Sequence, residues 1–223
     1  MFRSPAVLSV ATATLCVLTL ISSKAVAWQY VDEIDGVDIY ERDARYLGNQ
    51  TLQSVVEVDA PIGRVISVFT DPDERSNWMS RVADHEVLHI DGDVEDSWVE
   101  SYWMRIDMPF PLSDRDYVLA SSYELNPEEQ KLTVVTRSIY DERKPENGCC
   151  VRAQSVMRYT VEAIPGEDRT RIEMIAETDL DLDLPRHLIR SAGSDWSADT
   201  LSALAALAMS EDVPIDERVK DWP

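Results

Sequence analysis

The chain has 223 residues, of which 42 are acidic and 21 are Lys or Arg, so its formal net charge at pH 7 is −21. An acidic surface of this strength repels nucleic acid and anionic membranes, which argues against a nucleic-acid-binding role. The chain contains 7 glycines and no internal repeat or low-complexity tract. We therefore expect a single compact domain, since this length supports a sizeable core.

Residues 1–27 are typical of an export signal. Arg3 is followed by an apolar run over residues 7–21 and then by Ala25-Val26-Ala27. This order predicts a secretory signal peptide, which makes the mature protein periplasmic or secreted. The alternative is an uncleaved anchor, but the run is short for a span of about 20 residues. Cleavage would remove Arg3 and Lys24 and leave 196 residues, with 19 basic against 42 acidic side chains and a net charge of −23.

Beyond residues 1–27 the chain keeps two cysteines, Cys149 and Cys150, which are adjacent. In an oxidising compartment they can form a disulfide with each other or bridge two chains. They can equally remain two thiols in the turn that begins at Asn147-Gly148. None of these arrangements is a disulfide framework for a whole domain, so the fold must depend on its core.

The first elements alternate between strand and helix patterns. Residues 37–42 and 51–58 alternate in polarity or are β-branched, which predicts two strands. Asp59-Ala60-Pro61 predicts a helix start, because proline is favoured in the first turn, and an apolar stripe over 62–69 follows. Residues 73–78 are predicted as a turn or a short helical extension.

From residue 82 onward the pattern is one of strands separated by turn residues. Asp91-Gly92-Asp93, Asn126-Pro127, Asn147-Gly148 and Pro165-Gly166 indicate the turns. Strands joined in sequence by short turns predict an antiparallel sheet. The predicted strands are 85–90, 97–106, 116–125, 131–139, 152–164 and 170–178.

The last long element is a helix over residues 185–210. Apolar residues recur along it at four-residue spacings, which predicts an amphipathic helix that lays one face on the sheet. A strongly curved sheet that grips a helix encloses space, so the core between them need not be completely filled. The recurring residues are Leu184, Leu188, Ala192, Trp196, Leu204 and Ala208, and the stripe is widened by Leu201, Ala205 and Leu207.

Three segments, in this order, resemble landmarks of a known family. They are residues 69–78, residues 111–118 with Arg115-Asp116-Tyr117-Val118, and residues 184–189. The chain resembles START domains, the lipid-transfer domains related to steroidogenic acute regulatory protein. The resemblance implies an α+β helix-grip fold of the START and Bet v 1 type, a curved antiparallel sheet wrapped around a long C-terminal helix, with a tunnel for a sterol, phospholipid or similar ligand. It implies a START-like lipid-binding domain over 28–210 and a C-terminal tail over 211–223.

Period-two alternation assigns side chains to the inner face of the predicted strands and places Asp116 and Glu124 on the opposite, solvent-facing side. Relatives of this family can pair an inward carboxylate with a buried arginine, so we expect Glu100 and Arg115 each to meet the other, a ligand hydroxyl or water. The pair could equally be structural and contact no ligand. The predicted ligand-binding residues are Glu100, Tyr102, Met104, Arg115, Tyr117, Leu119, Tyr123, Met157, Met174, Leu188 and Trp196.

Together these features predict a monomeric, non-catalytic carrier that binds and transfers a lipid or sterol-like apolar molecule without metal or cofactor. Arg186, His187 and Arg190 form a basic spot at the start of the last helix, and we expect it to orient the cavity mouth during transient contact with a membrane. The main alternative is an enzyme of the same fold, of the polyketide cyclase type. Its acid–base candidates are Glu100, Tyr102, Tyr117 and Tyr123.

A second alternative is a zinc metalloprotease, because residues 85–89 fit the pattern H-E-x-x-H. That chemistry needs a helix, so that His85 and His89 face one metal while Glu86 activates water. In a strand the two histidines lie roughly 13 Å apart and cannot share a zinc ion. The apolar residues between them and the Asp91-Gly92-Asp93 turn that follows favour the strand.

Overall fold

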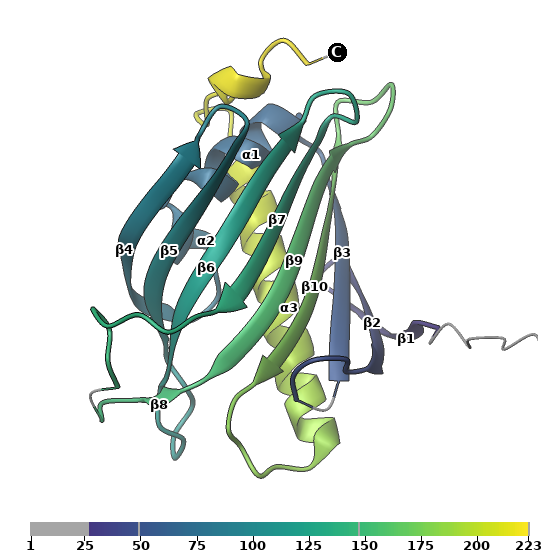
Figure 1. The fold of residues 1–223 in the computed structure, drawn as a ribbon. Coiled ribbons are helices and arrows are strands. Elements are labelled where there is room, and N and C mark those ends of the chain that lie inside the picture. The colour runs from purple at the N-terminus through teal and green to yellow at the C-terminus, as the bar shows by residue number, and fades with distance from the viewer. Residues whose placement is uncertain (1–26, 49, 147, 223) are drawn as a thin grey trace, which may run out of the picture.

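The computed structural model describes residues 27–48, 50–146 and 148–222. One antiparallel sheet curves around the long helix α3 (Arg186–Ala208), and two short helices lie on the same concave side (Figure 1). This confirms the predicted α+β helix-grip fold. The predicted signal peptide lies outside the described residues except for Ala27. Within the described ranges, no helix is both long and apolar enough to cross a membrane.

The sheet has ten strands in the order β1-β2-β3-β10-β9-β7-β6-β5-β4, with β8 paired to β6 beside this path. Every predicted strand is present, although the one predicted over 152–164 is divided in two at Ala153. The sequence did not indicate β1, because most of its residues are exposed and carry no clear alternation. The strands are β1 (Gln29–Ile34), β2 (Val37–Asp43), β3 (Gln50–Val58), β4 (Val82–Asp93), β5 (Ser97–Ile106), β6 (Arg115–Asn126), β7 (Lys131–Ser138), β8 (Val151–Arg152), β9 (Gln154–Ala163) and β10 (Thr170–Asp179).

The turn predicted at Asp91-Gly92-Asp93 was placed too early. These residues continue β4, and the turn to β5 follows at 94–96. Gly92 has a φ of +105°, and a Cβ there would lie 2.8 Å from the carbonyl oxygen of Ser97. Glycine is therefore required for close approach of the two strands rather than for the turn itself.

Helices α1 (Ile62–Thr70) and α2 (Arg75–Trp78) connect β3 to β4 and both contact α3. Pro61 precedes α1, as predicted from its preference for helix starts. Phe69 stacks on Trp78 with ring centroids 5.2 Å apart and meets Tyr159 edge-on at 5.0 Å. Aromatic side chains therefore fill the space between the sheet and the α1 end of the grip.

The buried face of α3 matches the predicted stripe only in the C-terminal half of the helix. Leu201, Leu204, Ala205 and Ala208 are buried there as predicted, whereas Leu188 is 48 % exposed and Leu184 precedes the helix. At 3.6 residues per turn, each four-residue step rotates a side chain by about 40° around the helix, so a strict four-residue row cannot stay on one face. The buried residues of α3 are Ser194, Ser197, Ala198, Thr200, Leu201, Leu204, Ala205 and Ala208.

The chain continues past α3 and packs against α1. The short 3-10 helix η1 (Glu217–Val219) places Val219, which is 3 % exposed, near Gly63, whose carbonyl accepts the N–H of Asp216 at 3.1 Å. Arg218 donates to the hydroxyl of Thr70 at 2.6 Å. The described part of the predicted tail thus packs along α1, from Gly63 in its first turn to Thr70 at its end.

Asp116 was predicted to face solvent, but it is buried. Strand β8 lies beside β6 and places Arg152 over Asp116, with a 2.8 Å ion pair, while the indole N–H of Trp103 donates to the same carboxylate at 2.9 Å. Burial acts to raise the pKa of Asp116, but the hydrogen bonds from Arg152 and Trp103 lower it. Glu124, on the same face, is exposed as predicted.

Candidate ligand-binding cavity

Two hollows lie between the N-terminal half of α3 and the strands. The first, here called the methionine pocket, has a volume of about 120 Å³ and is lined by Met104, Met108 and Met157 together with Tyr117. The second, the β3 pocket, has a volume of about 100 Å³ and lies against Leu52 of β3. Both are lined in addition by Thr178, Leu180, Gly193 and Trp196.

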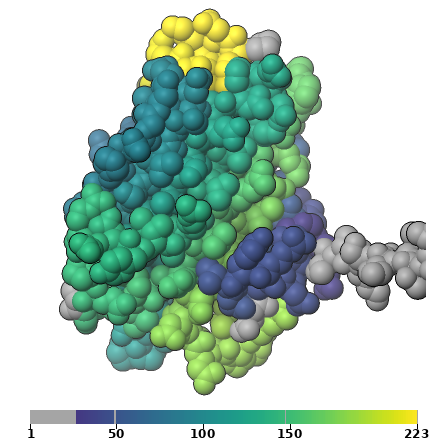
Figure 2. Space-filling model, viewed as in Figure 1, coloured from purple at the N-terminus to yellow at the C-terminus, as the bar shows by residue number. Residues whose placement is uncertain are grey.

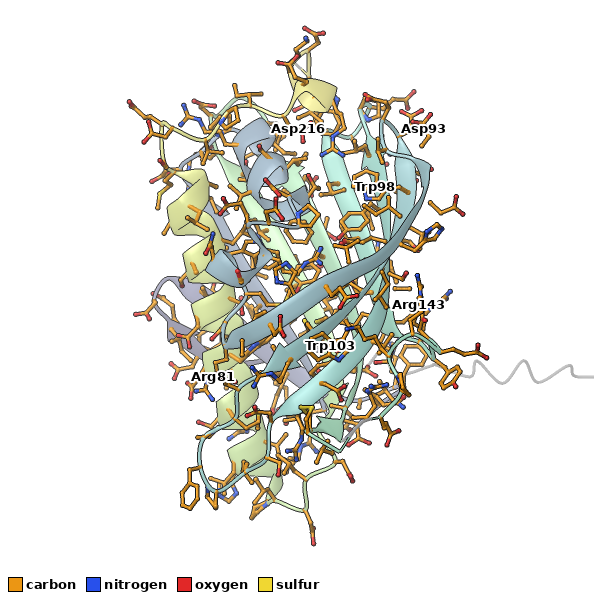
Figure 3. All side chains as sticks on the ribbon, turned by 90° about the vertical axis from the view of Figure 1, so that its left-hand side faces the viewer. Arg81, Asp93, Trp98, Trp103, Arg143 and Asp216 are labelled. Atoms are coloured by element: carbon orange, nitrogen blue, oxygen red, sulfur yellow. A yellow bond between two sulfur atoms is a disulfide. The ribbon has the colours of Figure 1, made fainter. Side chains whose placement is uncertain are left out.

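Trp196 lies between the two pockets. Its indole N–H donates to the carbonyl of Ser80 at 2.9 Å, which ties α3 to the segment between α2 and β4. Gly193, one turn earlier, lets α3 approach the sheet, because a Cβ there would lie 2.9 Å from the Cδ1 of Leu52. Figure 3 shows Arg81, which also lines the methionine pocket, beside α3.

A buried charged cluster lies deeper in the grip. Arg75 from α2 forms a 2.7 Å ion pair with Glu100 of β5, and the hydroxyl of Tyr123 donates to the same carboxylate oxygen at 2.9 Å. The guanidinium of Arg75 also lies 4.1 Å from the ring centroid of Tyr102. Burial acts to lower the pKa of Arg75, but its contacts with Tyr102, Tyr123 and Glu100 raise it, so the guanidinium stays charged.

The expected pairing of Glu100 with Arg115 is therefore wrong. Arg115 is buried at the start of β6, where its guanidinium donates to the carbonyls of Ser113, Leu180 and Asp181. These bonds join the β5–β6 loop to the segment between β10 and α3. Glu100 instead pairs with Arg75, which α2 places over the inner face of β5.

Family comparison agrees with this geometry. A sequence model of the START domain matches residues 10–207. The chain belongs to the START domain family. Comparison with the sequences of curated proteins gives no match.

Solved START structures share the fold at low sequence identity. Human StAR-related lipid transfer protein 5 is 16 % identical, with a TM-score of 0.72 over 84 % of this chain and 88 % of its own. A STAR-related lipid transfer protein fragment from Xanthomonas axonopodis is 21 % identical, with a TM-score of 0.68 over 82 % and 99 %. The human StarD13 (DLC2) lipid transfer and protein localization domain is 21 % identical, with a TM-score of 0.69 over 82 % and 90 %.

The eleven residues predicted to bind ligand occupy different parts of this START domain. Met104, Tyr117, Met157 and Trp196 line the methionine pocket. Arg115 holds the loops beside it, and Leu188 is exposed near the start of α3. The others are buried among packed side chains; they are Glu100, Tyr102, Leu119, Tyr123 and Met174.

Several pocket residues were missed by sequence reasoning. Met108 lies just past the end of β5, and Leu180 and Leu182 follow β10, so strand periodicity did not reach them. Gly193 was missed because its role is to bring α3 close to β3, which no spacing in the sequence reveals. The sequence did offer one clue to these loop residues. Arg115 begins a strand, and an arginine at that place can donate hydrogen bonds to the carbonyls of neighbouring loops.

Residues 85–89 form part of β4, as the sequence favoured, and not the helix that the H-E-x-x-H chemistry requires. The ring of His85 is half-buried, with its Nε2 2.9 Å from the carbonyl oxygen of Pro72, whereas His89 is exposed. The register shifts between Val87 and His89, so a bulge separates the two histidines. In the loop before β8, the sulfurs of Cys149 and Cys150 are joined to each other.

The pocket end of the molecule carries exposed apolar side chains. Phe110, in the β5–β6 loop, is 97 % exposed, and Leu184 and Leu188 are also exposed. The β5–β6 loop and the segment before α3 both project at the lower end of Figure 1. Arg186 and Arg190 form ion pairs with Asp43 and Glu41 at 3.2 and 3.1 Å.

Proposed function

We propose that this START domain binds one lipid or sterol-like apolar molecule without catalysis and transfers it as a monomer. The observation that carries the proposal is the pair of largely apolar pockets under the N-terminal half of α3. Burying apolar ligand surface there stabilises the complex by about 25 cal/mol per Å², before ordering costs. Methionine side chains suit such a site, because they adapt to ligands of irregular shape.

The pockets must join before a lipid can fit. Their volumes of about 120 and about 100 Å³ lie below the range of about 300–1,000 Å³ that is usual for ligand sites. Trp196 lines both, so rotation of its indole away from Ser80 would connect them. We infer that ligand binding selects or induces this opened arrangement.

The cyclase alternative is less well supported by the inner polar groups. Burial raises the pKa of the Tyr102, Tyr117 and Tyr123 phenols, which weakens them as acids at neutral pH. One oxygen of the Glu100 carboxylate, Oε2, is engaged by both Arg75 and Tyr123. These groups favour a structural role, and binding without turnover is the simpler function.

Transfer requires transient contact with a membrane. We propose that the pocket end, formed by the β5–β6 loop and the start of α3, makes this contact. Phe110 and Leu188 are the apolar side chains best placed to enter the bilayer interface. Arg186 and Arg190 supply positive charge there once their pairs with Asp43 and Glu41 open. Replacing Phe110 and Leu188 by serine should slow lipid transfer between vesicles and leave the amount of bound lipid unchanged; an unchanged transfer rate would remove this part of the proposal.

Native mass spectrometry with lipid extraction tests the binding itself. The chain should carry a bound apolar molecule that survives purification. Ala192→Phe should reduce the bound fraction, because Ala192 lines the methionine pocket. Ala206→Phe is the matched control, since Ala206 is exposed on the same helix away from the pockets. Equal occupancy in both variants would place the ligand elsewhere.

Export is proposed from the N-terminal segment alone. A protein recovered from the periplasm or the medium should begin at Trp28, which N-terminal sequencing of the mature chain would show. A mature chain that keeps residues 1–27 would favour the anchor instead.

A further inference from the structure

A groove lies on the convex face of the sheet, and β9 separates it from the methionine pocket, since Ser155 and Met157 line both. It has a volume of about 760 Å³ and lies beside the segment that connects β2 to β3. Figure 2 shows this segment, in dark blue-violet, lying across the green strands of the outer face. The groove is lined by Arg42, Arg45, Tyr46, Leu47, Arg137 and Arg158, among others.

Glu177 of β10 holds this connecting segment in place. Its carboxylate accepts the backbone N–H groups of Arg45, Tyr46 and Leu47 at 2.7–3.0 Å and the hydroxyl of Thr51 at 2.6 Å. Four donors therefore occupy the one carboxylate that lines the groove. Its negative charge is engaged by these donors and not by a guanidinium.

The register of the strands sets arginine beside aliphatic side chains. Arg158 of β9 lies opposite Ile175 of β10 on one side and Val135 of β7 on the other. In the next outward-facing row, Val156 lies opposite Arg137. Arg137 and Arg158 are thus diagonal neighbours, with Cα atoms about 7–8 Å apart and within reach of one shared ligand.

The charges of this groove are unbalanced, unlike those elsewhere on the same face. Nearer the other end of the strands, the row Glu57–Arg171–Glu162–Lys131 alternates in sign across four strands. In the groove, the side chains of Arg45, Arg137 and Arg158 have no ion pair or hydrogen bond with any described residue, and Arg42 lies over the ring of Trp28.

This imbalance stands out in a chain with 42 acidic and 21 basic residues. Eight other arginines of the described ranges form ion pairs with carboxylates. Uncompensated like charges this close are unfavourable, so an anion that joins them would stabilise the fold.

We propose that this groove binds a small amphiphilic anion. A carboxylate or phosphate head is held by Arg45, Arg137 and Arg158, and an apolar body lies over Val135, Val156 and Ile175. Guanidinium groups suit such heads, because they donate two parallel hydrogen bonds to them. The groove volume falls within the range usual for small-molecule sites. A bilayer is the poorer occupant, since it is flat and since an acidic protein is repelled by anionic membranes.

Methyl NMR with octyl phosphate tests the proposal independently of the inner cavity. Saturable shifts are expected at the methyls of Val135, Val156 and Ile175. Octanol and inorganic phosphate, which each lack one half of the ligand, should bind much more weakly. Octanoate, compared with octyl phosphate, tells which head group the arginines prefer. Arg137→Gln/Arg158→Gln should weaken binding by at least about tenfold.

The control variant is Lys131→Gln/Arg171→Gln, which removes the same charge from the balanced row and should bind octyl phosphate like the original chain. Inorganic phosphate in excess should also displace the probe from the unaltered protein. The proposal is overturned if the shifts are confined to Met104 and Ala192 in the inner cavity, if octanol binds as well as octyl phosphate, or if binding requires an intact vesicle. Failure here would leave the inner lipid site untouched.

Discussion

The two halves of α3 meet the sheet in different ways. The C-terminal half buries Leu201 and Leu204 completely and, together with α1 and α2, forms a packed end that also encloses the Arg75–Glu100 pair. The N-terminal half leaves Leu188 exposed and borders two pockets on either side of Trp196. The difference indicates that one helix both fixes the fold and leaves an end free to open, so stability and binding should respond to different substitutions.

The largest effect is expected from the buried charge of the packed end. Arg75→Met leaves Glu100 buried without its partner, which should lower the free energy of unfolding by about 3–5 kcal/mol. Arg186→Met, which removes only an exposed pair with Asp43, should cost less than about 1 kcal/mol. Urea unfolding of both variants measures the two costs, and equal losses would show that the Arg75–Glu100 pair is not special.

Leu201→Ala and Leu188→Ala compare the contributions of the two halves of α3 to stability. Leu201→Ala should lower the free energy of unfolding by about 2–5 kcal/mol, because a cavity replaces a fully buried side chain. Leu188→Ala should change it by about 0.5 kcal/mol or less. Thermal unfolding can rank the two, and a large loss in Leu188→Ala would mean that the N-terminal half is packed after all.

Glu177, which holds the β2–β3 segment on the outer face, makes the stability of the fold depend on pH. Burial acts to raise its pKa, but the hydrogen bonds from Thr51 and from the N–H groups of Arg45, Leu47 and Tyr46 lower it. A carboxylate with a lowered folded-state pKa adds stability above its unfolded pKa of about 4.3, and this is lost as pH falls through the folded pKa.

Glu177→Gln should therefore cost about 1–2 kcal/mol at pH 7, and the gap to the original chain should close below about pH 4. Urea midpoints at several pH values measure it. Glu124→Gln, at an exposed position, should show neither effect. A gap that persists at low pH would contradict the assigned role of the carboxylate.

The smallest change in stability, but a selective one, is expected at Trp196. Trp196→Phe removes the hydrogen bond to Ser80 and should cost about 1 kcal/mol while speeding lipid exchange, because the pockets join more easily. Trp103→Phe is the control: it loses a comparable hydrogen bond, to Asp116, on the outer face. If both variants exchange lipid at the same rate, Trp196 does not gate the cavity.

Alternation and turn residues predicted the sheet because burial on one face requires a period of two, which the strands from β2 to β10 mostly keep. The same rule correctly assigned Tyr102, Tyr117 and Tyr123 to the inside. It could not identify the partner of Glu100, because Arg75 reaches β5 only through the packing of α2. Nor could it locate the pockets, since these depend on where α3 crosses the sheet and on loop residues such as Met108 and Leu180.

NMR of the methionine methyl groups during titration with the lipid extracted from the protein tests the central claim most directly. Binding under the N-terminal half of α3 should shift Met104, Met108 and Met157, while Met209, exposed at the far end of the helix, should not move. Saturable binding that leaves the three pocket methionines unshifted would contradict the account.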